Sequence, residues 1–152
     1  MVRQALAPVV NRYIDGFRVA EYARVPTLDG DIGDAEVFLD ADKFCQALGN
    51  VLANACKYSP SSEPIAVRLV AADRDVGVSV ADRGEGMDEE TRQRIFERFY
   101  RAESTAGVAG TGLGMSIVKE IMDIHGGRIE IESTPRVGTV VTLWLPRAAP
   151  RG

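Results

Sequence analysis

Between residues 42 and 58 the chain carries its most regular hydrophobic pattern, and this pattern limits what the chain can fold into. Apolar side chains recur every three or four residues, at Phe44, Ala47, Leu48, Val51, Leu52 and Ala55. This spacing places them on one stripe of an α-helix, which must pack against a core. Asp40 or Asp42 suits the N-cap, and the run that begins at Ser59-Pro60 ends the helix. The sequence therefore predicts a long amphipathic helix here.

Other segments alternate between helical and strand-like patterns. Helical spacing predicts further helices over residues 3–23, 88–101 and 113–125. Alternation of apolar and polar residues predicts strands at 35–39, 65–69, 76–80, 129–131 and 141–145, and residues 27–34 read as an irregular connection. Hairpins in this mixed order indicate an α+β fold rather than a regular βαβ repeat. We predict a two-layer sandwich with one mixed, mostly antiparallel sheet and helices on one face.

Size and charge exclude several classes of function. The chain has 152 residues, of which 45% are hydrophobic and 26% charged, as expected of one globular domain. A net charge of −4 argues against nucleic-acid binding and against contact of this domain with an anionic membrane. Cys45 and Cys56 fall on the same predicted helix, whose rise would separate them by about 16.5 Å, too far for a disulfide. Unpaired thiols suit a reducing cytoplasm.

A polar stripe on the long helix is the first candidate for chemistry. Asn50, Asn54 and Lys57 follow one another at spacings of four and three, on one side of the helix. An asparagine carbonyl can give Mg²⁺ a hard oxygen ligand without adding negative charge beside a triphosphate. Lys57 offers a point charge for phosphate. The alternative is an ordinary solvated polar face.

Two glycine-containing segments are further candidates. Asp82 follows a strand and opens the run DRGEGM, in which Gly84 and Gly86 allow a ligand to approach the backbone. The alternative for this run is a common strand-ending turn. Residues 107–114 are rich in glycine and lead into a helix, and a helix amino terminus suits phosphate. This second run has neither the Gly-Lys-Ser/Thr ending of a P-loop nor the spacing of a dinucleotide fingerprint, and its alternative is a flexible linker.

Taken in order, these segments resemble the ATP-binding catalytic domain of sensor histidine kinases, within the Bergerat-fold ATPase superfamily shared with gyrase, Hsp90 and MutL. The resemblance extends over residues 35–146. Its five sequence boxes correspond to residues 40–60 (DADKFCQALGNVLANACKYSP), 82–87 (DRGEGM), 94–101 (RIFERFYR), 110–127 (GTGLGMSIVKEIMDIHGG) and 138–139.

The resemblance implies roles for individual residues. Asn54 would ligate Mg²⁺ with support from Asn50, and Lys57 and Tyr58 would contact phosphate and nucleotide. Asp82 would accept a hydrogen bond from the adenine amine. Other implied nucleotide contacts are Gly84, Gly86, Gly110, Thr111, Gly112, Leu113, Gly114 and Thr139.

A lid is also implied. Residues 102–112 would form this ATP lid, which Phe96 and Phe99 would anchor. Arg101 would approach the γ-phosphate or a partner carboxylate, although a surface arginine that complements the helix dipole is an equal alternative.

Two residues bear on the reaction. In the ATP hydrolases and serine kinases of this superfamily a glutamate precedes the magnesium asparagine by four residues, but Asn50 stands there, and an amide cannot act as a general base. His125, the only histidine, is followed by Gly126-Gly127 and reads as a helix-terminal residue whose cationic ring would suit the dipole, rather than as a phosphoacceptor. The phosphoacceptor would therefore lie in another domain, and this fragment should bind ATP without phosphorylating itself.

The resemblance thus predicts a kinase built from several parts. Residues 1–34 would connect to an upstream dimerisation and phosphoacceptor domain, 35–146 would bind Mg-ATP, and 147–152 would be a tail. The expected partners are that domain and a cognate response regulator, in the cytoplasm, whether or not the parent is anchored in the inner membrane. Two alternatives are an anti-sigma-type serine kinase and a non-catalytic docking module.

Overall fold

The computed structural model describes residues 1–16, 26–59, 63–96 and 114–150. The elements follow the chain in the order β1 (Val2–Ala5), α1 (Leu6–Gly16), β2 (Thr27–Asp29), β3 (Glu36–Leu39), α2 (Ala41–Tyr58), β4 (Ala66–Ala71), β5 (Asp75–Asp82), α3 (Glu89–Arg94), α4 (Gly114–Ile124), β6 (Arg128–Thr134) and β7 (Gly138–Pro146).

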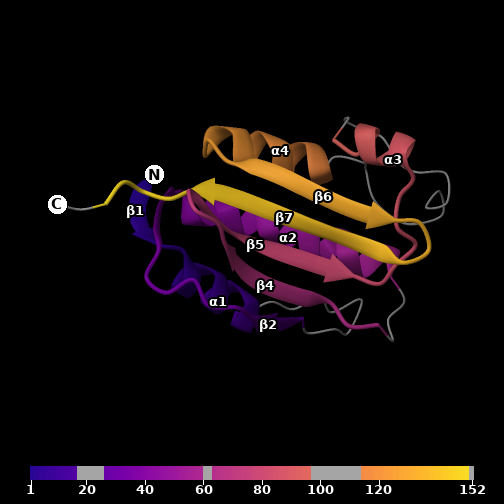
Figure 1. The fold of residues 1–152 in the computed structure, drawn as a ribbon, viewed down its shortest axis with the longest axis horizontal. Coiled ribbons are helices and arrows are strands. Elements are labelled where there is room, and N and C mark those ends of the chain that lie inside the picture. The colour runs from indigo at the N-terminus through magenta and orange to yellow at the C-terminus, as the bar shows by residue number, and fades with distance from the viewer. Residues whose placement is uncertain (17–25, 60–62, 97–113, 151–152) are drawn as a thin grey trace.

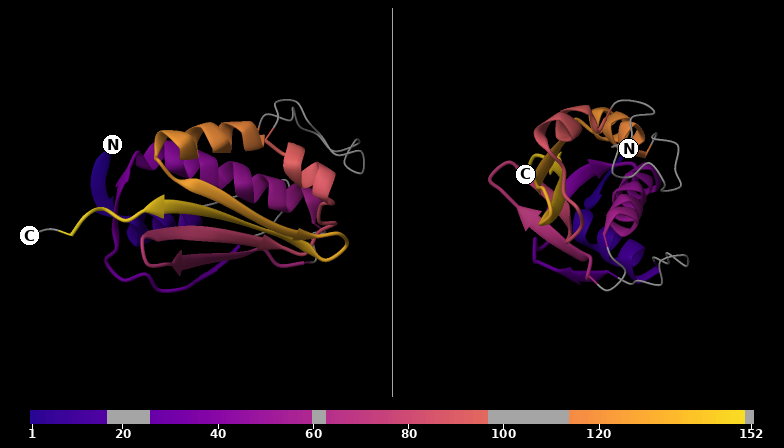
Figure 2. Two further views of the ribbon diagram at one scale, coloured as in Figure 1. Left: turned by 45° about the horizontal axis from the view of Figure 1, so that its top comes forward. Right: turned by 90° about the vertical axis from the view of Figure 1, so that its right-hand side faces the viewer.

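The main sheet has five strands in the order β2-β4-β5-β7-β6. Only the β2–β4 pair is parallel, and the other three pairs are antiparallel. Helices α2 and α4 lie side by side over one face of this sheet (Figure 1, Figure 2). The predicted α+β sandwich, with a mixed and mostly antiparallel sheet, is therefore confirmed. A separate two-stranded sheet, β1–β3, was not predicted.

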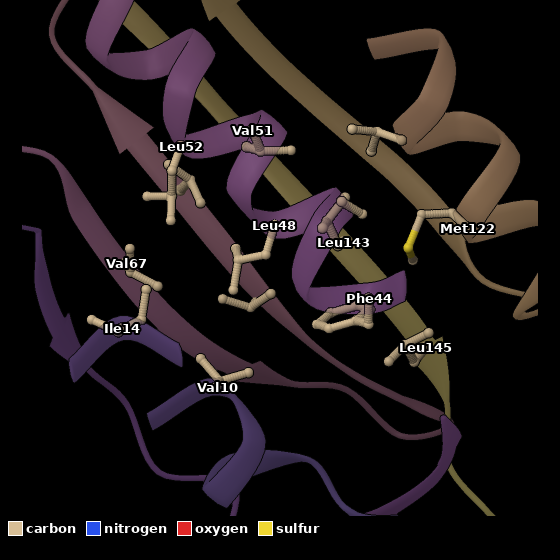
Figure 3. Close-up of a cluster of buried hydrophobic side chains, with 14 of the residues drawn as sticks. Val10, Ile14, Phe44, Leu48, Val51, Leu52, Val67, Met122, Leu143 and Leu145 are labelled. Atoms are coloured by element: carbon tan, nitrogen blue, oxygen red, sulfur yellow. The ribbon is translucent and has the colours of Figure 1, made fainter. Parts of the chain in front are cut away.

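The core lies between the helices and the sheet. All six apolar residues of the predicted stripe on α2 are buried, and they pack toward inward-facing side chains of β4, β5 and β7 (Figure 3). Burial of each large apolar side chain contributes about 1.5–3 kcal/mol. The strand alternation was also read correctly, because Val76, Val78 and Val80 of β5 are all buried. This core therefore holds α2 against the face of the sheet.

The helix predicted over residues 3–23 begins later than expected. Val2–Ala5 form β1, in which Arg3 lies opposite Phe38, and α1 starts at Leu6. Pro8 gives the reason, because its ring would clash with the carbonyl of residue 4 if the helix extended back that far. Residues 17–23 lie outside the described part of the chain. Side chains from α1 enter the common core at Leu6, Val10 and Ile14.

Residues 27–34, read from the sequence as irregular, contain the short edge strand β2. Thr27–Asp29 pair in parallel with β4. One apolar residue, Leu28, gives no visible alternation in so short a strand. Gly30 then turns the chain away with φ +93°, and a Cβ there would lie 2.2 Å from the carbonyl oxygen of Leu69. In the described residues no helix combines the length and apolarity needed to span a bilayer.

Candidate nucleotide site

A row of polar side chains crosses the end of the main sheet. Asp82 of β5 pairs with Thr139 of β7, which pairs with Ser133 of β6. Directly opposed residues in antiparallel strands point to the same face. The next row inward on this face is apolar, formed by Val80, Val141 and Ile131. The core face of the sheet therefore ends in a carboxylate and two hydroxyls.

The loop that follows Asp82 folds tightly over this row. The N–H of Gly84 donates to Asp82 Oδ1 at 2.8 Å, which orients the carboxylate. Gly86 has φ +69°, and a Cβ there would lie 2.0 Å from the carbonyl oxygen of Thr134. Glycine is therefore required at this position both by conformation and by space. A carboxylate has several acceptor positions, so Asp82 suits an amine donor.

The polar stripe of α2 faces the start of α4. Asn50, Asn54 and Lys57 are half-buried, and the Asn50 Nδ2 donates to the carbonyl oxygen of Gly114 at 3.3 Å. Gly114 is the first residue of α4. This contact brings together two of the sequence boxes, although Asn50 and Gly114 are 64 residues apart in the chain. The helix spacing continues the stripe from Asn50 to Asn54 and Lys57.

The amino terminus of α4 suits an anionic group. The first turn of α4 contains no acidic residue, so the positive end of the helix dipole is not neutralised from within that turn. A Cβ placed on Gly114 would meet nothing within 4 Å among the described residues. The start of α4, α3 and the β6–β7 turn all lie toward the same end of the molecule (Figure 1).

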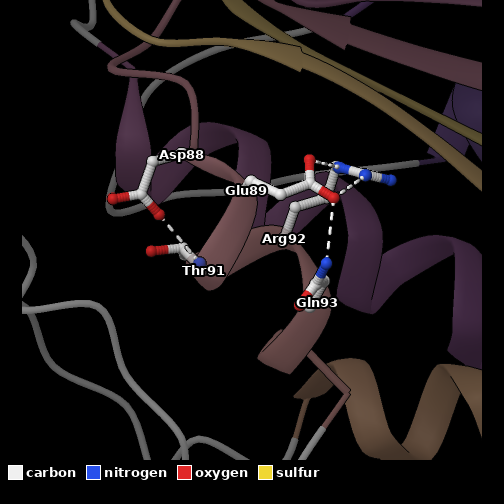
Figure 4. A network of polar contacts seen from close by, with 5 residues as sticks. All are labelled: Asp88, Glu89, Thr91, Arg92 and Gln93. Carbon is white, nitrogen blue, oxygen red and sulfur yellow. Dashed lines mark hydrogen bonds and ion pairs between the residues drawn. The ribbon is translucent and has the colours of Figure 1, made fainter.

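Helix α3 is held at its start by charge. The Asp88 carboxylate accepts from the Thr91 N–H at 2.8 Å, and this hydrogen bond lowers the pKa of Asp88 (Figure 4). Hydrogen bonds from Arg92 and then Gln93 lower the pKa of Glu89. Because α3 buries none of its own residues, these local contacts stabilise it. Asp88 is the N-cap predicted from the sequence.

The donor set fits Mg²⁺ bound together with a nucleotide. Among the described residues no group of three or more His, Cys, Asp or Glu side chains is placed to hold a metal ion. Mg²⁺ usually keeps several waters and phosphate oxygens and takes few protein ligands. The half-buried amide of Asn54, with Lys57 one turn further on, is compatible with this manner of binding.

Some of the site residues predicted from the sequence lie together in the structure, and others lie outside the described part of the chain. Asp82, Gly84, Gly86 and Thr139 meet at the sheet end. Phe96 packs against the core. The predicted residues Phe99, Arg101, Gly110, Thr111, Gly112 and Leu113, and the side chain of Tyr58, lie outside the described part of the chain.

Sequence reasoning missed Ser133. Its hydroxyl oxygen accepts from the Met87 N–H at 2.7 Å and contacts Thr139 Oγ1 at 2.8 Å. The signal was present in β6, where the inward positions Ile129 and Ile131 are followed by a serine. A hydroxyl at a position that continues a row of inward apolar residues indicates a hydrogen-bond partner nearby, because polar groups that face inward are usually hydrogen-bonded.

His125 is not placed as a phosphoacceptor. It is 7% exposed at the end of α4, where Nδ1 lies 2.8 Å from the Ile121 carbonyl oxygen and Nε2 accepts from the Asp40 N–H at 3.1 Å. Nε2 can accept only if it carries no proton, so the contacts assign a neutral ring with its proton on Nδ1. The cationic ring predicted from the sequence is therefore wrong, whereas its helix-terminal position is confirmed.

These arrangements define an α+β nucleotide-binding domain, with a carboxylate at the sheet end and an amide-bearing helix against a helix amino terminus. The chain belongs to the histidine kinase-, DNA gyrase B- and HSP90-like ATPase family, which matches residues 39–149. The resemblance identified from the sequence is thus confirmed, and the chain is an ATP-binding domain of this family.

Individual relatives are sensor kinases. The chain is 39% identical over 135 residues to the sensor protein IrlS of Burkholderia pseudomallei, covering 84% of this chain and 29% of IrlS. It is 40% identical over 113 residues to the sensor histidine kinase YvrG of Bacillus subtilis, covering 74% of this chain and 20% of YvrG. A solved structure of the mycobacterial sensor histidine kinase MprB superposes with a TM-score of 0.79 at 28% identity, covering 96% of this chain and 97% of that one. The chain thus spans less than a third of the length of IrlS or YvrG.

Proposed function

We propose that this chain is the catalytic domain of a two-component sensor histidine kinase, which presents Mg-ATP to a histidine on a separate domain. The observation that carries this proposal is the hydrogen bond from Asn50 to Gly114. It holds the amide-bearing stripe of α2 against the amino terminus of α4, where a triphosphate would gain from the dipole. The relationship to sensor kinases supports the same conclusion.

In this proposal the two halves of the site bind the two ends of the nucleotide. Asp82 accepts from the adenine amine, while Gly84, Gly86 and Thr139 line the base. On α2, Asn54 ligates Mg²⁺, and Lys57 and Tyr58 contact phosphate and nucleotide. When bound, Mg²⁺ neutralises charge on the triphosphate. The remaining proposed contacts are Arg101, Gly110, Thr111, Gly112, Leu113 and Gly114.

Asn50 favours phosphoryl transfer over hydrolysis by this domain. An amide cannot remove a proton from water, and the amide nitrogen of Asn50 is already a donor to Gly114. We therefore assign the domain to positioning and charge stabilisation, and the acceptor group to another domain. The same residue argues against a serine kinase that carries its own base.

The proposed partners follow from the missing acceptor. His125 is buried and bonded through both ring nitrogens, so we place the phosphoacceptor in an upstream dimerisation domain, to which residues 1–34 connect. Residues 35–146 would be the ATP-binding domain and 147–152 a tail. A cognate response regulator would receive the phosphoryl group, in the cytoplasm.

Calorimetry with Mg-ATP tests the site. Asn54→Ala and Asp82→Ala should each abolish measurable binding, because one removes the metal ligand and the other the acceptor for the adenine amine. Matched controls are Asn11→Ala on the exposed side of α1 and Asp73→Ala in the β4–β5 turn, which should bind like wild type. If both site variants also bind like wild type, the assignment is wrong.

Labelled ATP tests the reaction. The chain alone should incorporate no label, whereas a histidine-bearing acceptor domain added to it should become labelled on histidine. Serine phosphorylation by the chain alone would instead support the serine-kinase alternative.

A further inference from the structure

Ser133 stands at the centre of three hydrogen-bond contacts at the sheet end. Its Oγ accepts from the Met87 N–H at 2.7 Å, lies 2.8 Å from Thr139 Oγ1, and lies 3.3 Å from the carbonyl oxygen of Gly138, to which it can donate. Met87 ends the loop that begins at Asp82. One side chain therefore connects this loop to the hydroxyl that lies beside Asp82 in the sheet.

Counting protons restricts what these groups can do. A serine hydroxyl has one proton and two lone pairs, and the Met87 N–H occupies one lone pair. If Ser133 donates its proton to the Gly138 carbonyl oxygen, Thr139 must donate its own proton to Ser133. Thr139 then has no proton left for a ligand and can only accept a hydrogen bond from it. If Ser133 donates to Thr139, the proton of Thr139 becomes available to a ligand. Ser133 thus controls whether Thr139 acts as a donor or as an acceptor.

The 2.8 Å contact between the hydroxyls of Ser133 and Thr139 fits either direction of donation, so it does not choose between the arrangements. The 3.3 Å contact with the Gly138 carbonyl oxygen is longer than usual for a hydroxyl donor, which weakens the first arrangement and leaves the second open to a ligand. A carboxylate acceptor and a hydroxyl donor then lie side by side in the row formed by Asp82 and Thr139. This pattern complements adenine, which presents an amine donor at N6 beside an acceptor at N1. Guanine presents the reverse pattern on the same edge.

Backbone packing makes the arrangement rigid. A Cβ on Gly86 would lie 2.0 Å from the Thr134 carbonyl oxygen, and a Cβ on Gly138 would lie 2.2 Å from the Asp82 carbonyl oxygen. The loop after β5 and the β6–β7 hairpin therefore touch through their main chains on both sides of Ser133. These contacts hold the backbone of Ser133 in place, and its three hydrogen-bond contacts orient the hydroxyl.

We propose that Ser133 is a positioning residue for base recognition, because it keeps Thr139 a donor beside Asp82 and anchors the loop through Met87. This inference rests on the proposed function, in which Asp82 meets the adenine amine. Ser133 itself does not contact the base. Thr139 reaches the adenine edge directly or through one water, which can relay a hydrogen bond nearly as well.

Nucleotide discrimination measured by calorimetry tests this role. Ser133→Ala should weaken Mg-ATP binding roughly tenfold, because the half-buried Met87 N–H loses its acceptor and the loop that begins at Asp82 is no longer held in place for the base. It should weaken Mg-GTP binding less, so that the preference for ATP over GTP falls several-fold. Ser133→Thr keeps the hydroxyl and should restore the preference. A matched control is Ser79→Ala, a buried serine on the other face of the same sheet, which should leave the preference unchanged.

The outcomes separate this inference from the proposed function. If wild type binds ATP and Asp82→Ala does not, but Ser133→Ala keeps both the affinity and the preference, the role of Ser133 is wrong. Equal weakening of ATP and GTP by Ser133→Ala would also overturn it, because a purely structural loss affects both. If wild type does not bind Mg-ATP, the proposed function itself fails.

A measurement on wild type covers the case in which Ser133→Ala does not fold. The amide-proton chemical shift of Met87 should respond more to ATP than to GTP, and more than the amide shifts of Ser79 and Thr142 do. Equal responses to the two nucleotides would contradict the inference.

Discussion

The Nε2 atom of His125 accepts a hydrogen bond from the backbone N–H of Asp40, at 3.1 Å, across 85 residues of sequence. Asp40 is the N-cap of α2, and its side chain accepts from the Lys43 N–H. His125 follows the last residue of α4, and its ring meets that of Phe44 edge to face at a centroid distance of 6.3 Å. One side chain therefore joins the end of α4 to the start of α2, at the opposite end of α4 from the Asn50–Gly114 contact.

Replacing His125 should destabilise the whole domain. His125→Ala leaves the Asp40 N–H without its partner and removes the contact with Phe44, so we expect the free energy of unfolding to fall by about 2–3 kcal/mol. Urea denaturation measures this loss. Nitrogen-15 NMR of the wild-type ring should show the proton on Nδ1 at neutral pH. A ring that carries its proton on Nε2 would contradict the assignment.

Gly86 should tolerate no side chain. Gly86→Ala would force a residue at φ +69° and place its Cβ against the Thr134 carbonyl oxygen, so the loop must move. Gly33→Ala is the matched control, because Gly33 has φ +58° but open space around the added Cβ. The control should lose only about 1 kcal/mol to backbone strain. Gly86→Ala should lose more stability in urea melts and should also lose Mg-ATP binding. Equal stability losses would show that the Thr134 contact is unimportant.

Asn50 should be sensitive to charge even without nucleotide. Asn50→Asp replaces the donor to the Gly114 carbonyl oxygen by a carboxylate, which cannot donate and repels that oxygen. At neutral pH we therefore expect Asn50→Asp to destabilise the nucleotide-free protein more than Asn50→Ala, by about 1–2 kcal/mol. Thermal unfolding without Mg²⁺ or ATP measures the difference. Asn11→Asp on α1 serves as the exposed control. Equal unfolding temperatures for the two Asn50 variants would contradict the contact.

Much of the fold could be predicted because its hydrophobic patterns are long. The stripe on α2 and the alternation in β5 extend over enough residues for one face to be unambiguous. Strands β1 and β2 were missed because Val2–Ala5 and Thr27–Asp29 are too short to show a period. Their structure comes from pairing with β3 and β4, which lie far away in the sequence. Pro8 was a local signal for the start of α1 that the helical spacing obscured.

The candidate site was predictable only where residue type indicates chemistry. Asn54 and Asp82 stand out, because amides and carboxylates beside glycines suit a metal-bound nucleotide. Ser133 gives a weaker signal, a hydroxyl that continues the inward positions of β6, and its place in the site becomes visible only when the register aligns it with Thr139 and Asp82. The charge state of His125 was wrong for the same reason, since its partner Asp40 is remote in sequence.

Acid should loosen α3 before it unfolds the core. The Thr91 hydrogen bond lowers the pKa of Asp88, and the hydrogen bond from Arg92 is the main cause of the lowered pKa of Glu89. A carboxyl group whose pKa is lower in the folded state stabilises that state above its unfolded pKa, so this contribution disappears as the pH falls below about 4. Amide exchange at Thr91 should therefore lose protection in this range while Val78 in β5 stays protected. Asp88→Asn keeps a neutral side-chain oxygen that can cap the helix. This variant should flatten the pH dependence of Thr91 exchange, because the amide has no carboxyl group to protonate and its oxygen still accepts from the Thr91 N–H. An unchanged pH dependence in Asp88→Asn would show that some other group controls the start of α3.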